Sequence, residues 1–350
     1  MDKDRSQKMT LQQKNKEVEE FANDVAICLA TETKRLNPKY LYDHLGSQLF
    51  EQICVQPEYY LTRIEASLLK RHAPLITTLV GSDIRIIELG SGSSSKTALL
   101  LRYLSSQKKR IIYFPIDISI SILMESTRRL KSQFPNASII AIRSDYGTGV
   151  DRAAAKCMAT DGVRGKKKKK TNKSNKNGNQ YSKLILFLGS SIGNFEPMAA
   201  RSLLRSIREK LHTSDFLLVG FDLQKDESVL TAAYNDKAGI TAKFNLNLLA
   251  RINRELGGNF ELEKFKHYAY YNREQHRIEM HLVSNTDQQV YIDALGKNFS
   301  FGKGDSIHTE NSYKYSLDQI AALAKDSGFR LKKEFTDEKR WFNMALLSPS

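Results

Sequence analysis

The sequence contains few cysteines and no long apolar run, and each shortage excludes a class of protein. Cys28, Cys54 and Cys157 are too scattered among 350 residues to form a disulfide framework or a zinc motif. No apolar stretch reaches the roughly 18 residues of a membrane-spanning helix, and the first twenty residues are too polar for a signal peptide. We therefore expect a cytoplasmic protein without a membrane partner.

Acidic residues are the minority among the charged residues. The sequence contains 39 Asp and Glu and 54 Lys and Arg, which gives a net charge of +15. Residues 151–183 alone carry +9, because eleven basic residues there face two acidic ones. Their lysine-rich centre cannot bury enough apolar surface to offset its ordering entropy, so we expect a disordered insertion over residues 160–180. A nuclear-import or polyanion-binding patch is the alternative. No aromatic residues are interleaved with the lysines, which argues against a nucleic-acid partner.

The middle of the chain alternates short apolar runs with helical patterns. The apolar runs are residues 84–89, 111–116, 138–142, 184–188 and 216–221, and the helical segments are residues 94–104, 120–133 and 198–210. Continuous apolar strands that alternate with helices predict an α/β fold whose parallel sheet is covered on both faces.

The alternation stops near Asp226, which indicates a second kind of module. Helical patterns are predicted over 11–35, 226–234 and 240–256, and strand-like alternation over 277–284 and 289–294. A capping box of Ser316 and Gln319 begins a last helix, after which residues 329–335 and 341–347 are predicted to rejoin the sheet. We expect one domain from residues 63–224 and 315–350, and an α+β domain from residues 1–62 and 225–314.

The first apolar run ends in a glycine loop, ELGSGSSSKT, that opens the next helix. Glycines there let the backbone approach a ligand, and a helix N-terminus favours negative charge. A P-loop requires G-x-x-x-x-G-K-[ST], and Ser95 stands where its second glycine belongs. The other interpretation is a loop that holds the amino-acid end of S-adenosylmethionine (SAM).

Acidic residues follow the next two apolar runs. Asp117 ends the second run, where a carboxylate can accept hydrogen bonds from both ribose hydroxyls of a nucleoside. Asp145 and Tyr146 follow the third run, where an acid suits an adenine amino group and an aromatic ring can lie against the base. Each acid alone is better explained as a turn or helix-cap residue. Three strand ends in register favour a nucleoside site, because ligands bind at the carboxyl ends of parallel strands.

The fourth apolar run ends in FLGSSIGNF, which places Gly189 and Asn194 where a second substrate would meet the cofactor. The Asn194 amide can both donate and accept hydrogen bonds, so it could hold a zwitterionic amino acid. A left-handed turn residue is an equally good interpretation of Asn194.

Together these segments resemble the L-histidine Nα-methyltransferases of ergothioneine biosynthesis, whose relatives include fungal methyltransferases of tryptophan-derived substrates. The resemblance runs from about residue 37 to the end and is carried by YDHLGSQLFEQICVQPEYYLTRIEASLL, IELGSGSSSKTALLL, PIDIS, FLGSSIGNFEP, GFDLQKDESVLTAAYNDKAGITAKFNLNLLARINRELG, RIEMHL and IHTENSYKYS. It implies a Rossmann-like class I SAM methyltransferase domain with a second α+β substrate-binding lobe. The implied reaction is SAM-dependent methylation of the α-amino group of L-histidine, up to trimethylhistidine (hercynine).

The resemblance also implies roles for individual residues. The implied cofactor-binding residues are Gly90, Lys96, Asp117, Asp145, Tyr146 and Gly189. The implied substrate-binding residues are Tyr42, Tyr59, Asn194, Tyr234, Met280, Glu310 and Ser312. Asn194 and Tyr234 would hold the α-amino and carboxylate groups, and Met280, Glu310 and Ser312 would line an imidazole pocket. A carboxylate pairs naturally with an imidazole N–H, so Glu310 favours histidine over an indole substrate.

We expect a monomer that binds a small amino acid, and no metal, because the seven histidines show no metal-ligand spacing. No residue is assigned as a general base. Three alternatives remain open: a methyltransferase for another amino acid such as a tryptophan derivative, a P-loop nucleotidase, and an RNA-binding protein that uses the lysine-rich segment.

Overall fold

The computed structural model describes residues 2–81, 83–162 and 181–350, and side chains from residue 15 onward except 82 and 159–180. The chain divides into two compact units. Tyr60–Asp226 and Ser312–Ser350 form the Rossmann unit, and Met1–Tyr59 and Glu227–Asn311 form the α+β unit. Of the insertion predicted to be disordered, residues 163–180 lie outside the described residues, and 160–162 end a helix.

The Rossmann unit contains one mixed sheet, in the order β12-β13-β6-β5-β1-β2-β3, with β4 also paired to β2. Its strands are β1 (Ile84–Leu89), β2 (Ile112–Asp117), β3 (Ser138–Ile139), β4 (Ile142–Arg143), β5 (Ser182–Phe187), β6 (Phe216–Asp222), β12 (Phe329–Thr336) and β13 (Phe342–Pro349). Neighbours are parallel except at β13, which runs antiparallel to β6 and to β12. Leu89 pairs with Ile116, and Glu88 with Leu186, so β1, β2 and β5 end at one edge.

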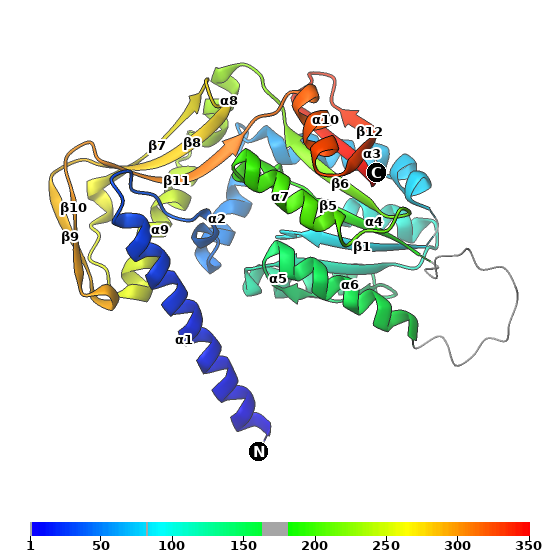
Figure 1. Ribbon diagram of the computed structural model, residues 1–350, viewed down its shortest axis with the longest axis horizontal. Coiled ribbons are helices and arrows are strands. Elements are labelled where there is room, and N and C mark those ends of the chain that lie inside the picture. Colours follow the sequence, from blue (N-terminus) through cyan, green and yellow to red (C-terminus); the bar gives the residue numbers. More distant parts are fainter. Residues whose placement is uncertain (1, 82, 163–180) are drawn as a thin grey trace, which may run out of the picture. The chain divides into compact units, whose positions relative to one another are not determined.

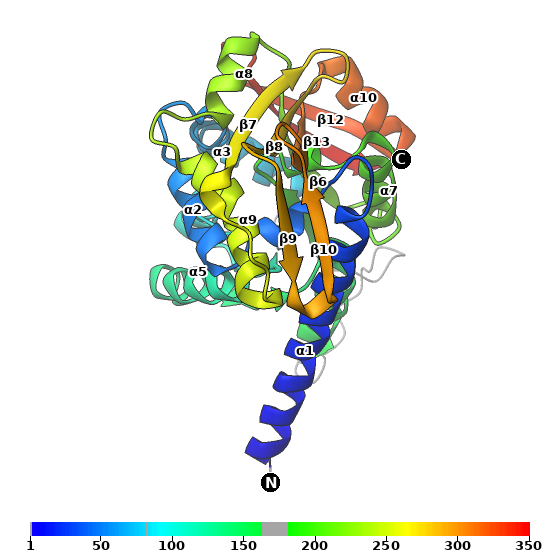
Figure 2. The same cartoon turned by 90° about the vertical axis from the view of Figure 1, so that its left-hand side faces the viewer.

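Helices cover both faces of this sheet, which confirms the predicted Rossmann-like fold. They are α3 (Tyr60–Val80), α4 (Thr97–Ser106), α5 (Ile120–Gln133), α6 (Tyr146–Gly162), α7 (Pro197–Arg208) and α10 (Leu317–Asp326), with the short η2 (Ser191–Asn194). Figure 2 shows the sheet nearly edge-on, with α3 and α5 to its left and α7 and α10 to its right. Val150, Leu204 and Ile320 of α6, α7 and α10 bury their side chains in one core with the strands. The predicted capping box of Ser316 and Gln319 is present at the start of α10.

Every residue of β1 and β6 is buried, as expected for strands covered on both faces. The run predicted over residues 138–142 is instead two short edge strands. Both β3 and β4 pair with β2 in the same register, and the strand is interrupted only at residues 140–141. Helix α6, which follows, was not predicted from the sequence.

The α+β unit combines helices with two small antiparallel sheets. Its helices are α1 (Asp2–Leu29), α2 (His44–Cys54), α8 (Glu227–Tyr234) and α9 (Ile240–Leu256), with the short η1 (Pro38–Leu41), η3 (Leu262–Lys264) and η4 (Asp293–Leu295). Its strands are β7 (Phe265–Asn272), β8 (Arg277–Ser284), β9 (Gln288–Ile292), β10 (Lys297–Phe301) and β11 (Ser306–Tyr313). The strands form a sheet in the order β11-β8-β7 and a β9–β10 hairpin.

Local signals explain where the helices of this unit end. Helix α9 ends at Gly257, which adopts the left-handed conformation with φ 66°. Helix α1 ends at Leu29, six residues before the predicted end at Arg35. There the Thr31 hydroxyl donates to the carbonyl of Cys28 at 2.9 Å, and such side-chain bonds compete with the helix. Among the described helices, none is long and apolar enough to cross a membrane.

Candidate active site

The glycine loop follows β1, which is labelled in Figure 1, and its Ser91 N–H donates to the Ile116 carbonyl of β2 at 2.9 Å. Gly90 and Gly92 have φ values of 62° and 48°, which L-residues with side chains rarely adopt. A Cβ at Gly90 would lie 3.1 Å from the hydroxyl of Tyr146, so a side chain there would crowd Tyr146 as well as strain the backbone. The Gly92 N–H donates to Oδ2 of Asp117 at 2.8 Å. The loop and the carboxylate at the end of β2 thus form one structure.

The Asp117 carboxylate is held in place by two backbone groups. Its Oδ1 accepts from the Ser119 N–H at 2.9 Å, and its Oδ2 accepts from Gly92. An ionised carboxylate has about four acceptor positions. A carboxylate oriented in this way at the end of a parallel strand is suited to accept hydrogen bonds from the hydroxyls of a ribose.

A buried carboxylate of α3, Glu65, connects the glycine loop to the end of β5. Glu65 is 0% exposed and forms an ion pair with Lys96, which precedes α4. The same carboxylate accepts from the Gly189 N–H at 2.9 and 2.8 Å. Gly189 has φ 79°, and a Cβ there would lie 3.2 Å from Nζ of Lys96. The sequence prediction included Lys96 and Gly189 but missed Glu65, because these partners follow it by 31 and 124 residues.

A second carboxylate, Glu88, lies beneath the glycine loop in the core. It is 2% exposed and accepts from the Thr97 hydroxyl at 2.6 Å and from the Tyr113 hydroxyl. Burial raises the pKa of Glu88 to about 7, although these two hydrogen bonds act in the opposite direction. In a P-loop the residue at position 97 would bind Mg²⁺. Here the Thr97 hydroxyl donates into the core, which argues against the P-loop alternative.

Asp145 and Tyr146 lie at the start of α6. Oδ1 of Asp145 accepts from the Thr148 N–H at 2.9 Å, so this exposed carboxylate caps the helix. The Tyr146 ring lies 5.2 Å, between centroids, from that of Phe187 at the end of β5. With its hydroxyl close to Gly90, Tyr146 forms one wall beside the glycine loop. The helix-cap interpretation therefore applies to Asp145, and an adenine contact for either residue stays a prediction.

Asn194 is the last residue of η2 and is partly buried. The left-handed residue of this turn is Ser190, with φ 56°, rather than Asn194. A Cβ at Gly193 would lie 2.8 Å from the Tyr313 carbonyl oxygen, so η2 packs tightly against the end of β11. Ser312, its neighbour on β11, is 4% exposed, and its Oγ accepts from Nζ of Lys314 at 2.9 Å.

Asp222, at the end of β6, is the centre of a buried charged network that the sequence analysis missed. Its carboxylate accepts from the Tyr60 hydroxyl at 2.8 and 2.9 Å and pairs with Lys314 at 2.8 Å. It also pairs with Lys225. Burial alone would raise the pKa of Asp222, but the two ammonium groups lower it. This network fixes Lys314 and, through it, the hydroxyl of Ser312.

Tyr42, Tyr59 and Tyr234 belong to an aromatic chain inside the α+β unit. The centroid of Phe50 lies 5.5 Å from that of Tyr42 and 6.3 Å from that of Tyr59, which in turn lies 6.2 Å from that of Tyr234. Burial, together with the nearby Tyr234, raises the pKa of Tyr59 well above its ordinary value. Tyr59 therefore remains a neutral phenol that can donate a hydrogen bond.

Met280 and Glu310 come from neighbouring strands, β8 and β11, and are 2% and 7% exposed. The Met280 carbonyl accepts from the Thr309 hydroxyl at 3.0 Å, which ties the two strands together at this point. The charge of Glu310 is among the influences that raise the pKa of Tyr59. The structure thus groups the predicted cofactor residues within the Rossmann unit, and Tyr42, Tyr59, Tyr234 and Glu310 within the α+β unit.

Comparisons with known proteins bear on the whole chain. A family profile described as "Histidine-specific methyltransferase, SAM-dependent" matches residues 21–349. The histidine N-alpha-methyltransferase of Mycolicibacterium smegmatis is 34% identical over 328 residues, which are 94% of each chain. The protein with the same name from Mycobacterium tuberculosis is 33% identical over 92% of this chain and 93% of its own length. Ergothioneine biosynthesis protein 1 of Neurospora crassa is 31% identical over 87% of this chain but only 32% of its own.

Proposed function

The chain belongs to the histidine-specific, SAM-dependent methyltransferases, and on this premise we propose that it transfers methyl groups from SAM to the α-amino group of L-histidine. The observation that carries the proposal is the family match over residues 21–349, which includes both units. Two relatives named histidine N-alpha-methyltransferase align with the chain over nearly their full lengths. Successive transfers would give the trimethylated betaine, hercynine, the first step towards ergothioneine.

The residues at the edge of the Rossmann sheet fit SAM. Gly90 and Gly92 place no side chain at two positions of the loop, and the oriented carboxylate of Asp117 offers acceptors to a ribose. Lys96, held by the buried Glu65, would contact the methionine end of the cofactor, and Tyr146 would lie against the adenine. When bound, SAM supplies a methyl group that its sulfonium makes electrophilic.

We assign the amino-acid end of the substrate to Asn194 and Tyr234, with Tyr42 and Tyr59 beside it. An amide can accept from an ammonium or amine and donate to a carboxylate. Glu310 and Ser312 would hydrogen-bond the imidazole, and Met280 would pack against the ring. Lys314 donates to the Ser312 oxygen at 2.9 Å, which holds this hydroxyl in place at the end of β11.

The protein's task in the reaction is to position a neutral amine. The α-ammonium group must lose its proton to solvent water before its nitrogen can attack, and desolvation lowers the pKa of an ammonium. The raised pKa of Tyr59 keeps its phenol protonated, so Tyr59 can orient the amine but does not remove its proton at neutral pH. Holding the amine in line with the transferred methyl group provides most of the rate enhancement.

Turnover of a small set of substrates tests the proposal. Methyl transfer should be measured by mass spectrometry with L-histidine, its Nα-monomethyl and Nα,Nα-dimethyl forms, histamine and L-tryptophan. We expect all three histidine forms to converge on one trimethylated product. Histamine lacks the carboxylate and L-tryptophan lacks the imidazole, so both should be poor substrates. Preferential methylation of L-tryptophan would instead favour the indole alternative.

Two variants test the assigned roles. Asn194→Ala and Tyr234→Phe should each reduce kcat/KM for L-histidine by about 10- to 100-fold, the size of a lost hydrogen bond to a charged group. SAM affinity, measured by calorimetry in the absence of histidine, should change little in either variant. Unchanged turnover in both would contradict the assignment while leaving the reaction itself intact.

A further inference from the structure

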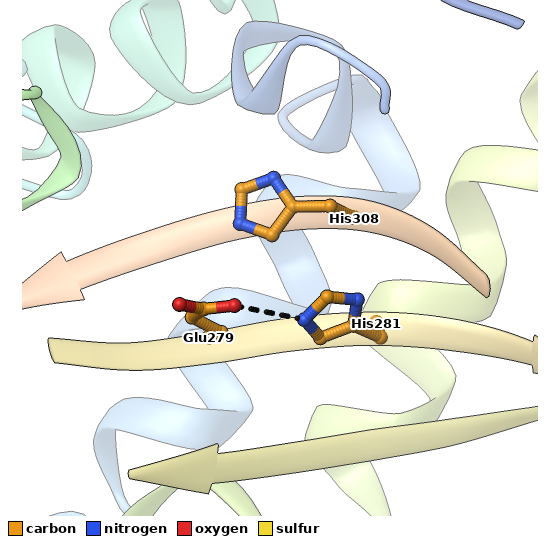
Figure 3. Close-up of side chains that lie close together, drawn as sticks. All are labelled: Glu279, His281 and His308. Carbon is orange, nitrogen blue, oxygen red and sulfur yellow. Dashed lines mark hydrogen bonds and ion pairs between the residues drawn. The ribbon is translucent and has the colours of Figure 1, made fainter. Parts of the chain in front are cut away.

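Three side chains of metal-ligand type meet on the three-stranded sheet of the α+β unit (Figure 3). Glu279 and His281 are two residues apart on β8, so they lie on the same face, and His308 comes from the neighbouring strand β11. One ligand atom from each of the three lies within 4.8 Å of the others. Met280, between Glu279 and His281, points to the opposite face of the sheet. The linear spacing of the histidines did not reveal this cluster, because its ligands come from two strands distant in sequence.

One pair of side chains in the cluster already has the spacing of two zinc ligands. Nε2 of His281 lies 3.2 Å from Oε2 of Glu279. Two ligand atoms bound tetrahedrally to zinc at about 2.0–2.1 Å are about 3.3 Å apart. A metal ion could therefore replace the proton between His281 and Glu279 with little movement of either side chain.

Neighbouring groups orient the ligands. Tyr270 donates to Oε2 of Glu279 at 2.8 Å, and Asn272 donates to its Oε1 at 2.9 Å. Nε2 of His308 lies 2.8 Å from Oδ1 of Asn311, an acceptor that selects the tautomer with the lone pair on Nδ1. Outer-shell hydrogen bonds of this kind are typical of metal sites, where they fix ring orientation.

We propose that Glu279, His281 and His308 bind one divalent transition-metal ion of the Zn²⁺ class, with water in the remaining position. Imidazole and carboxylate ligands suit Zn²⁺ and its neighbours in the first transition row. Arg277 donates to Oε1 of Glu279 at 2.8 Å, and its positive charge opposes the cation. This charge limits the affinity of the site for the metal ion, so removing it by substitution should increase that affinity.

Metal titration of the full-length, chelator-treated protein tests the proposal. Co²⁺ is added first and followed by its visible absorption, and Zn²⁺ is then used to displace it. Free histidine chelates both ions, so it is left out. We expect one equivalent of Co²⁺ with a tetrahedral spectrum, and displacement by one equivalent of Zn²⁺. Wild-type protein that gives no such spectrum would overturn the proposal.

Variants separate this site from adventitious binding. His281→Ala and His308→Ala should each weaken Zn²⁺ binding at least about tenfold, and the exposed His212→Asn serves as the control with no effect. Arg277→Gln keeps a hydrogen-bond donor beside Glu279 but removes the repulsion, so it should tighten binding. Equal Zn²⁺ affinity in the wild type, His281→Ala and His308→Ala would contradict the proposal, as would weaker binding in Arg277→Gln.

Discussion

At the scale of single residues, the carboxylates of the Rossmann unit differ in what surrounds them. Asp117 is oriented by backbone N–H groups and remains partly exposed, whereas Glu65 and Glu88 are buried and satisfied by protein groups. Asp117 could be predicted from the sequence because its place at a strand end is a local signal. Glu65 could not, because its partners Lys96 and Gly189 follow it by 31 and 124 residues.

Asp117→Asn tests whether that carboxylate holds a ribose. The amide can keep one backbone hydrogen bond, but it loses the charge and part of the acceptor capacity. We expect SAM to bind about 10- to 100-fold more weakly, as for lost hydrogen bonds to a charged group. Calorimetric titration with SAM measures this effect, with the exposed Asp318→Asn as the matched control. Equal affinities in the two variants would exclude the proposed role.

Glu88 should make stability depend on pH. Its pKa rises from 4.5 to about 7 on folding, so the folded protein binds the proton more tightly. The resulting stabilisation is fully present below about pH 4.5 and is lost as the pH rises to about 7, in total about 3 kcal/mol.

In Glu88→Gln this titration is absent. The free energy of unfolding of the wild type, relative to that of the variant, should therefore fall between pH 4.5 and 7. Denaturant unfolding at several pH values measures it. If the wild type and the variant differed in free energy of unfolding by an amount that stays constant across this range, or grows with pH, the raised pKa of Glu88 would be contradicted.

At the scale of elements, the strands of the large sheet could be predicted because they are buried on both faces and appear as continuous apolar runs. β7, β10 and β11 were missed because one side of each is polar or partly exposed. In β11, for example, His308, Glu310 and Ser312 interrupt the apolar pattern. Such strands depend on partners that a local pattern does not reveal.

The contact between α3 and β6 gives a test at this scale. A Cβ at Gly220 would lie 2.1 Å from Oε1 of Glu65, so Gly220→Ala should displace this carboxylate and disturb Lys96 and Gly189. We expect a loss of about 1–3 kcal/mol in stability, as for other overpacked sites, together with weaker SAM binding.

Gly147→Ala is the control, because a Cβ there makes only an ordinary contact of 3.7 Å with Asp145. It should leave stability unchanged or slightly raised, since alanine favours the helix. An equal or greater free energy of unfolding for Gly220→Ala than for Gly147→Ala would contradict the tight packing of Glu65 against β6.

At the scale of the whole molecule, the residues with proposed roles belong to two units of different architecture. The residues proposed to bind SAM lie in the Rossmann unit, and most of those proposed to bind histidine lie in the α+β unit. The change of pattern near Asp226 could be predicted because buried parallel strands appear as continuous apolar runs between helices, whereas antiparallel strands alternate apolar and polar residues. The roles of individual substrate residues could not be derived from such patterns and rest on the family resemblance.

The lysine-rich segment is predicted to be unnecessary for catalysis. Residues 163–180 carry eight of the basic side chains and no acidic ones, which is more than half of the net charge of +15. Replacing them with a short Gly/Ser linker should leave kcat/KM for L-histidine within about twofold and sharply reduce retention on a heparin column. A large loss of turnover, with the protein still folded, would instead assign this segment a part in the reaction.

The central claim is that the chain methylates L-histidine, and mass spectrometry of one reaction mixture tests it most directly. The purified protein is incubated with SAM and an equimolar mixture of the twenty common amino acids. The account predicts that L-histidine alone gains methyl groups, up to three, on its α-nitrogen. Methylation of a different amino acid, or none of L-histidine by protein that binds SAM, would contradict it.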